Sequence, residues 1–369
     1  MIATLSRLVR LLVLPGALLL AACGSDSVPA PPTPTRALVA LYGTGDLVAL
    51  SLADGSVVDT FTPTYWPHAV AVRGDLARAV SVSWDGGMVE EIDLSGSTLA
   101  ATGNATAGTG EPFVATYAGN TAATASYGST VFSLWTPPAA EQTFSFANGS
   151  SMWDVASSRA GTRLFFADYG GQGAVFVTDG AGTLLDEFFL ATDLPAEAAS
   201  SSSPVALAVS PDGARLYVAN YNTGSGGQAD DVMVFDVAAN GTLSFVKRVF
   251  LEDADDPAVV ADLYDSTGLA VSPDGSEVWI AYDAWGSVDG GGAAVYQAAT
   301  DRVDVVPFGG GARPCEIAVD WLGGKAYLPG TDYASGLGTD EIVVVDVATL
   351  AVTSIPLPAG SQPTGIALY

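Results

Sequence analysis

The sequence predicts an all-β fold, a seven-bladed β-propeller with four antiparallel strands in each blade. Three observations carry this prediction: two hairpins built on one turn motif, weaker copies of the same unit along the chain, and a last unit that stops after a single strand. The composition agrees with it. Hydrophobic residues make up 49% of the chain and can fill a large core, whereas only 14% are charged, against about 25% in an ordinary globular protein.

The two clearest hairpins span residues 205–220 and 267–282. Each joins an apolar strand to a second strand through a Ser-Pro-Asp-Gly turn, at Ser210–Gly213 and Ser272–Gly275. Proline presets φ, aspartate bonds to its own backbone, and glycine accepts a positive φ. This order of residues between two apolar runs favours a β-hairpin.

Weaker copies extend the pattern over the chain, so that first strands are expected near residues 68, 113, 154, 205, 268, 316 and 365. Residues 36–369 divided among seven units give about 48 residues per unit, which matches the ~40–50-residue periods of propellers. The last unit has one strand, and residues 38–42, 46–50 and 56–61 supply the three that it lacks. We therefore expect the N-terminal strands to pair with the C-terminal strand and close one domain, which removes the open sheet edge.

The N-terminal residues have the features of a targeting segment. Arg7 and Arg10 precede an apolar run at residues 11–20 that is too short to span a bilayer easily. Leu20-Ala21-Ala22-Cys23 resembles a bacterial lipobox. Residues 1–22 are therefore predicted to be a lipoprotein signal peptide, with Cys23 lipidated and then made N-terminal by cleavage. Gly24, rather than aspartate, implies sorting to the outer membrane.

Residues 23–35 follow as a proline-rich tether that favours extended polyproline II. We expect a bacterial cell-envelope protein, held on the membrane by its lipid and facing the periplasm or the cell surface. The formal net charge is −27, and loss of the two leader arginines leaves 11 − 40 = −29. Such an acidic domain is not a nucleic-acid binder, which needs a basic face.

The second strand of one hairpin reads Tyr217-Val218-Ala219-Asn220, and residues 279–282 and 327–330 are looser versions of it. Together with the Ser-Pro-Asp-Gly turns, these stretches resemble the YVTN family of seven-bladed β-propellers. The resemblance covers nearly the whole mature chain and implies the fold. It leaves function open, because the family includes binding proteins, cell-surface proteins and enzyme-like relatives.

In a propeller, residues just ahead of each first strand converge on one mouth of the central channel. A small polar ligand, a cation or an envelope partner could bind there, and the alternative is a merely solvated rim. The candidate mouth residues are Trp66, His68, Glu111, Trp153, Asp154, Asp265, Arg313 and Glu316.

Three long loops, at residues 222–231, 251–265 and 330–340, combine Asp with Gly and could bind Ca²⁺, although none has EF-hand spacing. His68 is the only histidine and Cys315 the only thiol besides Cys23, so no catalytic triad is visible. The leading hypothesis is a lipid-anchored binding platform without catalysis. The alternative is a lactonase-like or other hydrolase with a divalent metal in the channel, using His68, Glu111, Asp154 and Glu316.

Overall fold

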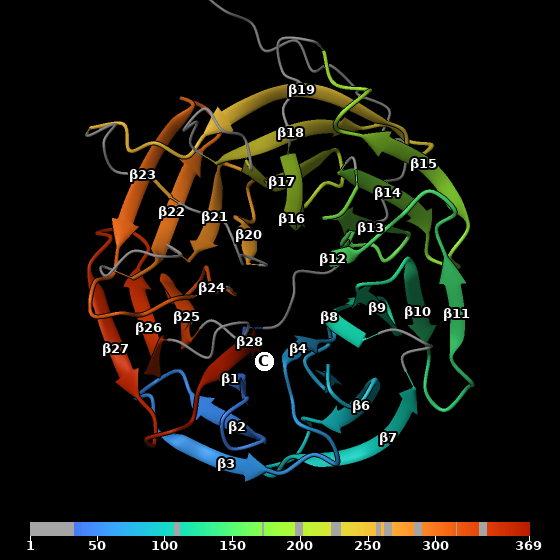
Figure 1. The fold of residues 1–369 in the computed structure, drawn as a ribbon. Coiled ribbons are helices and arrows are strands. Elements are labelled where there is room, and N and C mark those ends of the chain that lie inside the picture. The colour runs from blue at the N-terminus through green and yellow to red at the C-terminus, as the bar shows by residue number, and fades with distance from the viewer. Residues whose placement is uncertain are drawn as a thin grey trace, which may run out of the picture. The chain divides into compact units, whose positions relative to one another are not determined.

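A computed structural model describes residues 33–106, 111–171, 173–195, 202–222, 230–255, 260–261, 268–283, 290–314, 316–331 and 338–369. Seven four-stranded antiparallel sheets stand around a central axis, which confirms the predicted seven-bladed propeller (Figure 1). The first strands begin within three residues of the predicted positions. Within these described ranges, no helix is long and apolar enough to cross a membrane.

We number the blades 1 to 7 along the ring, beginning with the sheet that contains β1. From the channel outward, blade 1 is β28 (Pro363–Leu368), β1 (Arg36–Leu41), β2 (Asp46–Ser51) and β3 (Val57–Phe61); blade 2 is β4 (Ala69–Val72), β5 (Arg78–Ser83), β6 (Met88–Asp93) and β7 (Ala100–Thr106); blade 3 is β8 (Glu111–Ala118), β9 (Thr121–Tyr127), β10 (Val131–Trp135) and β11 (Gln142–Ser145); blade 4 is β12 (Met152–Ser157), β13 (Arg163–Asp168), β14 (Ala174–Asp179) and β15 (Leu184–Phe189); blade 5 is β16 (Ser202–Val209), β17 (Arg215–Asn222), β18 (Asp231–Val237) and β19 (Leu243–Phe250); blade 6 is β20 (Leu269–Val271), β21 (Glu277–Tyr282), β22 (Gly292–Gln297) and β23 (Arg302–Pro307); and blade 7 is β24 (Ala318–Asp320), β25 (Lys325–Thr331), β26 (Gly338–Asp346) and β27 (Val352–Pro356).

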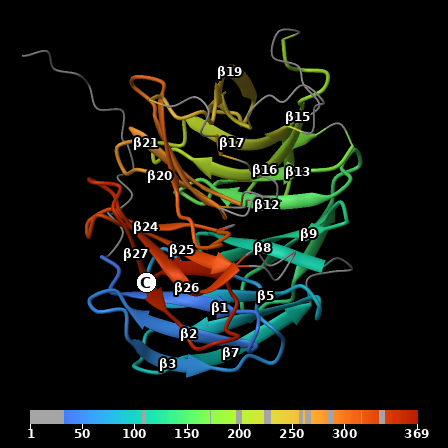
Figure 2. The ribbon, with the colours of Figure 1, turned by 60° about the vertical axis from the view of Figure 1, so that its left-hand side comes forward.

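The ring closes in blade 1 as predicted. The C-terminal strand β28 pairs antiparallel with β1, with Ala37 opposite Leu368 and Val39 opposite Ile366. The C-terminus accordingly lies next to β1 in both views (Figures 1 and 2). The sheet formed by β28 with β1, β2 and β3 therefore has four strands, as each of the other six sheets has.

The Ser-Pro-Asp-Gly turns have the hydrogen bonds and the backbone conformation that their residue types predict. The Ser210 hydroxyl donates to Asp212 Oδ1 at 2.6 Å, and the same oxygen accepts the Ala214 amide at 3.0 Å. Gly213 takes a φ of 71°, which an L-residue rarely adopts. The turn at Ser272 repeats these bonds, so two neighbouring blades present the same hairpin end.

The second strand of each blade has a chemical polarity that follows the repeat. It begins with a basic residue in five blades: Arg36, Arg78, Arg163, Arg215 and Lys325. In all of these except blade 1, whose first strand is the C-terminal β28, that residue follows the hairpin turn. In four of them an aspartate of the third strand is the direct cross-strand neighbour: Asp93, Asp179, Asp236 and Asp346. Arg78 Nη1 lies 2.5 Å from Asp93 Oδ1, and Arg215 Nη1 lies 3.0 Å from Asp236 Oδ1.

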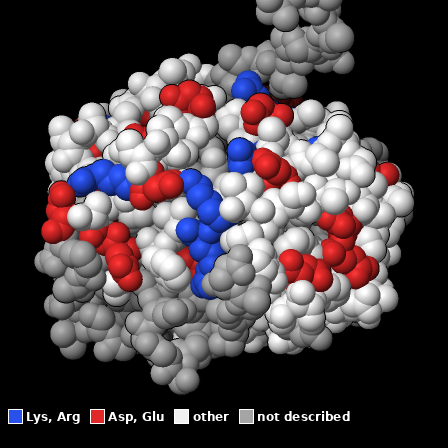
Figure 3. All heavy atoms as spheres, turned by 90° about the horizontal axis from the view of Figure 1, so that it is seen from above, with Lys and Arg blue, Asp and Glu red and all other residues white. Residues whose placement is uncertain are grey.

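We call the side that carries these turns the turn face and the opposite side the mouth face. On the turn face, the repeat places many of the described cations beside carboxylates. Figure 3, which looks onto the molecule from the side of β19, likewise shows Lys and Arg side chains lying next to Asp and Glu.

Candidate functional site: the channel mouth

The structure places the mouth candidates in three different environments. Trp66 is 53% exposed, and its ring meets Tyr42 edge to face at a centroid distance of 5.7 Å. Glu111 is exposed and accepts a hydrogen bond from Trp84 Nε1. His68 and Trp153 are buried. Asp265 lies outside the described residues.

The central channel holds two of the candidate carboxylates. Its cavity of ≈ 300 Å³ is lined by the first strands of blades 2 to 6, which include Asp154, and by Glu316. Asp154 Oδ1 accepts the Val155 amide at 2.7 Å, and Oδ2 accepts the Leu207 amide of the next blade at 2.6 Å. Asp154 is buried, and this burial outweighs the two amides and raises its pKa to about 7.

Glu316 keeps partial contact with solvent, and its Oε1 accepts the Ile317 amide at 3.2 Å. The dense protein around the carboxyl, and then the charge of Asp154, raise the pKa of Glu316 well above its usual range. Each channel acid is therefore biased toward its neutral form and already engaged by backbone amides. Two such groups do not fit the ligand set that a divalent metal requires.

Elsewhere in the described ranges, no three His, Cys, Asp or Glu side chains gather to hold a metal ion. Of the three loops that could bind Ca²⁺, at residues 222–231, 251–265 and 330–340, residues 223–229, 256–259, 262–265 and 332–337 lie outside those ranges. The Ca²⁺ prediction therefore stands as a prediction.

His68 is enclosed and joins blades 2 and 3. Its Nδ1 lies 2.9 Å from the Phe113 carbonyl oxygen and donates to it, and its own carbonyl accepts the Thr364 hydroxyl at 2.8 Å. Burial lowers the pKa of His68 to about 4, so the ring is neutral at neutral pH. His68 as a whole is only 4% exposed, which leaves its ring no access to a substrate in the channel.

Arg313 is also engaged. Its Nη1 lies 3.4 Å from Oδ1 of Asp283, whose side chain is fully buried. The guanidinium is 12% exposed, so it serves as a structural partner more than as a group offered to solvent.

The residues that sequence reasoning missed lie six positions after the first residue of the second strand, where that strand reaches the mouth face. Five blades place an aromatic residue there: Tyr42, Trp84, Tyr127, Tyr169 and Tyr221. Blades 6 and 7 have Asp283 and Thr331 instead. Aligning the repeats on the second strand, rather than on the turn, would have exposed this signal.

Aromatic residues near the beginning of the first strands β8 and β12 interleave with these to form one continuous cluster over blades 2 to 4. We define the aromatic arc as Trp84, Phe113, Tyr127, Trp153 and Tyr169. Centroid distances along it are 6.3 Å for Trp84–Phe113, 5.9 Å for Phe113–Tyr127, 5.4 Å for Tyr127–Trp153 and 4.7 Å for Trp153–Tyr169.

The arc has a buried base and a solvent-facing edge. Phe113 and Trp153 are buried, whereas Tyr127 is 37% exposed and Trp84 and Tyr169 are half-buried. Tyr127 also meets Trp84 edge to face, with an interplanar angle of 80°. Rings held at such angles present both edges and faces to a bound group.

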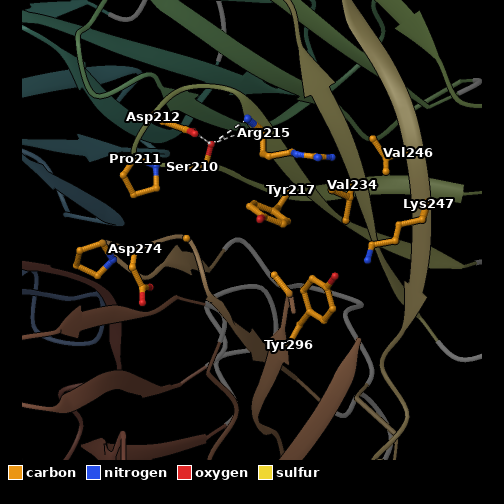
Figure 4. A pocket seen from close by; sticks show the side chains of 13 residues that line it. Ser210, Pro211, Asp212, Arg215, Tyr217, Val234, Val246, Lys247, Asp274 and Tyr296 are labelled. Atoms are coloured by element: carbon orange, nitrogen blue, oxygen red, sulfur yellow. Dashed lines mark hydrogen bonds between the residues drawn. The ribbon is translucent and has the colours of Figure 1, made fainter. Parts of the chain in front are cut away.

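A second cavity of ≈ 420 Å³ lies between blades 5 and 6 on the turn face. Figure 4 shows the side chains of Arg215, Tyr217, Lys247 and Tyr296 around it. Both cations are already paired, Arg215 with Asp236 and Lys247 with Asp301, which also accepts the Tyr296 hydroxyl at 2.8 Å. The two cations of this cavity are therefore neutralised within the protein, while Asp212 and Asp274 accept the serine hydroxyls of their own turns.

Comparison with known proteins supports the fold. No family model and no curated protein matches the chain. Solved structures do. A protein provisionally assigned as a 6-phosphogluconolactonase from Bacteroides fragilis matches with a TM-score of 0.65 and 17% identity, over 91% of this chain and 98% of its own. The periplasmic gluconolactonase of Pseudomonas aeruginosa matches with a TM-score of 0.65 and 18% identity, over 90% and 98%.

A third match, hydrazine synthase from Kuenenia stuttgartiensis, has a TM-score of 0.66 and 15% identity, over 88% of this chain and 99% of its own. The named functions of these three proteins differ. At such identities the likeness shows the seven-bladed propeller and nothing finer.

Proposed function

We propose that this chain is a lipid-anchored protein of the bacterial cell envelope, related to the YVTN propellers, that binds a ligand or an envelope partner at its channel mouth without converting it. Cys23 would carry the lipid, and residues 24–35 would hold the propeller away from the membrane. The lipobox-like sequence and the proline-rich segment support this arrangement.

The aromatic arc is the observation that carries the binding proposal. Aromatic side chains at equivalent positions of neighbouring blades gather on one face of a rigid scaffold, and several keep exposed surface there. Exposed aromatic clusters supply contact area with little loss of side-chain entropy on binding, and they mark interaction sites.

The hydrolase alternative draws support from the two lactonase-named neighbours. The environments of the four residues predicted to catalyse hydrolysis do not support this alternative. His68 is enclosed and neutral, Asp154 and Glu316 accept backbone amides, and Glu111 accepts the Trp84 indole. Among the described residues, the hydrogen bonds of these four side chains go to backbone groups and to the Trp84 indole, not to a nucleophile that they could activate.

Binding can be tested with the purified full chain and an envelope extract from the source cells. We expect Tyr127→Leu to recover at least about five-fold less of whatever the wild type captures, because truncating one central interface aromatic typically costs more than 1 kcal/mol. Phe250→Leu is the matched control, since Phe250 is 39% exposed but lies on the outer strand β19. Hydrolysis of glucono-δ-lactone above the buffer rate, abolished by Glu316→Gln, would instead establish the hydrolase.

The anchor has its own test. Cys23→Ser should move the protein from the membrane fraction to the soluble fraction, because a serine cannot receive the thioether-linked lipid and the acidic domain has no electrostatic attraction to anionic lipid. Ser25→Ala serves as the control and should stay in the membrane fraction. Membrane recovery of Cys23→Ser equal to the wild type would contradict lipid anchoring.

A further inference from the structure

The mouth face differs from the turn face in how its charges are balanced. Glu111 and Asp85 are exposed beside Trp84, and the channel below contains Asp154 and Glu316. In the part of the chain that the structure describes, the basic residues toward the mouth are Arg248 and Arg313. Each pairs with a fully buried aspartate, Asp231 and Asp283. Among the described residues, the two mouth cations thus pair with Asp231 and Asp283 and not with Glu111 or Asp85, whereas the two channel acids are biased toward their neutral form.

Glu111 links this charge to the aromatic arc. Its carboxylate accepts the Trp84 indole through Oε2, and its backbone is the cross-strand neighbour of Tyr127. Tyr127 stands at 80° to Trp84 and 78° to Trp153. Two electron-rich rings at nearly a right angle, with a carboxylate at their edge, form the corner of an aromatic cage.

Such a corner favours ligands of one charge and one degree of hydration. The negative quadrupole at a ring face attracts a cation that is weakly hydrated, and a nearby carboxylate adds a counter-charge. An anion would be repelled by Glu111 and Asp85. A bare metal ion would need several oxygen ligands, which the described residues do not bring together.

We infer that the ligand of the mouth is a small organic cation, an amine or a quaternary ammonium compound, held against Trp84 and Tyr127 with Glu111 as its counter-ion. This inference rests on the proposed binding function and specifies the ligand class of the same site. The interleaved repeat explains its place, because blades 2 and 3 bring together the two rings and the acid.

The test compares choline with its uncharged isostere 3,3-dimethylbutan-1-ol by calorimetric titration of the full chain. The two molecules have nearly the same shape, so the difference in affinity isolates the charge. We expect choline to bind at least about ten-fold more tightly, and its affinity to fall between 50 mM and 500 mM salt. The affinity for the isostere should not change with salt.

Variants locate the site. Glu111→Gln keeps an oxygen for the Trp84 indole but removes the charge, and should weaken choline binding about three- to ten-fold while leaving the isostere unaffected. Tyr127→Leu should weaken choline binding at least about five-fold, and Phe250→Leu should leave it unchanged. Thermal unfolding of each variant checks that the fold persists.

The outcomes separate the two proposals. Equal affinity for both probes, or tighter binding of a neutral sugar such as glucose, would overturn the inference that the ligand is a cation. The mouth would still be a binding site. Failure of choline to bind overturns the cation as well. If, in addition, Tyr127→Leu recovers as much envelope material as the wild type does, the proposed binding function is overturned together with the cation inference.

Discussion

Replacing Gly365 by valine is expected to lower the free energy of unfolding by about 2–3 kcal/mol, because the new side chain would overpack the junction that closes the ring. A Cβ at Gly365 would lie 2.9 Å from Ala69 Cα and 3.0 Å from the His68 carbonyl oxygen. Those atoms belong to the entry of the neighbouring blade, so β28 could not keep its place beside both β1 and β4. Chemical denaturation measures the effect.

Gly74→Val is the matched control, because a Cβ at Gly74 would have no heavy atom within 4 Å. Its free energy of unfolding should stay within about 0.5 kcal/mol of the wild type. Deleting residues 363–369 should lower the free energy of unfolding far more than either substitution. It would expose the edge of β1 and remove the buried side chains of Ile366 and Tyr369, at about 1.5–3 kcal/mol each. Equal denaturation midpoints for Gly365→Val and Gly74→Val would contradict the role of this junction.

Asp154→Asn is expected to become more stable than the wild type as the pH rises, with the difference in unfolding free energy growing by about 3–4 kcal/mol between pH 4 and pH 7. The pKa of Asp154 is raised to about 7 in the folded chain, from an ordinary value of 3.8. Below pH 4 the carboxyl is protonated in both states. Between pH 4 and 7 the unfolded chain releases this proton and the folded chain keeps it, so the wild type alone loses stability.

Urea unfolding of both proteins at several pH values measures this difference. The depressed pKa of His68 acts in the opposite direction, because the unfolded chain gains a proton there as the pH falls from about 6.5 to about 4. That contribution is common to both proteins and cancels in the difference. A constant difference for Asp154→Asn would mean that the channel acid ionises as freely as one in water.

The fold could be predicted from local chemistry. The Ser-Pro-Asp-Gly turns, the alternation of apolar runs and the count of first strands are all short-range features, and each depends on φ preferences and hydrogen bonds within a few residues. The incomplete last unit even predicted which strands close the ring. Trp66, His68 and Asp154 could be assigned to one end of their blades for the same reason, because each lies close to the start of a first strand.

The roles of those residues could not be predicted in the same way. His68 and Glu111 are similar in the sequence, since each stands at the start of a first strand, yet one is buried against Phe113 and the other is exposed beside Trp84. The partner of Asp154 is the Leu207 amide, 53 residues away in the next blade. Burial and partner depend on how adjacent blades pack, which no single repeat contains.

The sequence by itself determined the blade, its turns, the number of blades and the closure, because these follow from backbone preferences and from a period that the chain repeats. Only the tertiary structure decided which mouth residues face solvent, which acids are held neutral, and that aromatic residues from successive blades meet in an arc. The physical reason is that burial, desolvation and ring contacts are properties of the space between blades. Residues about 40 positions apart become neighbours only when the ring has closed.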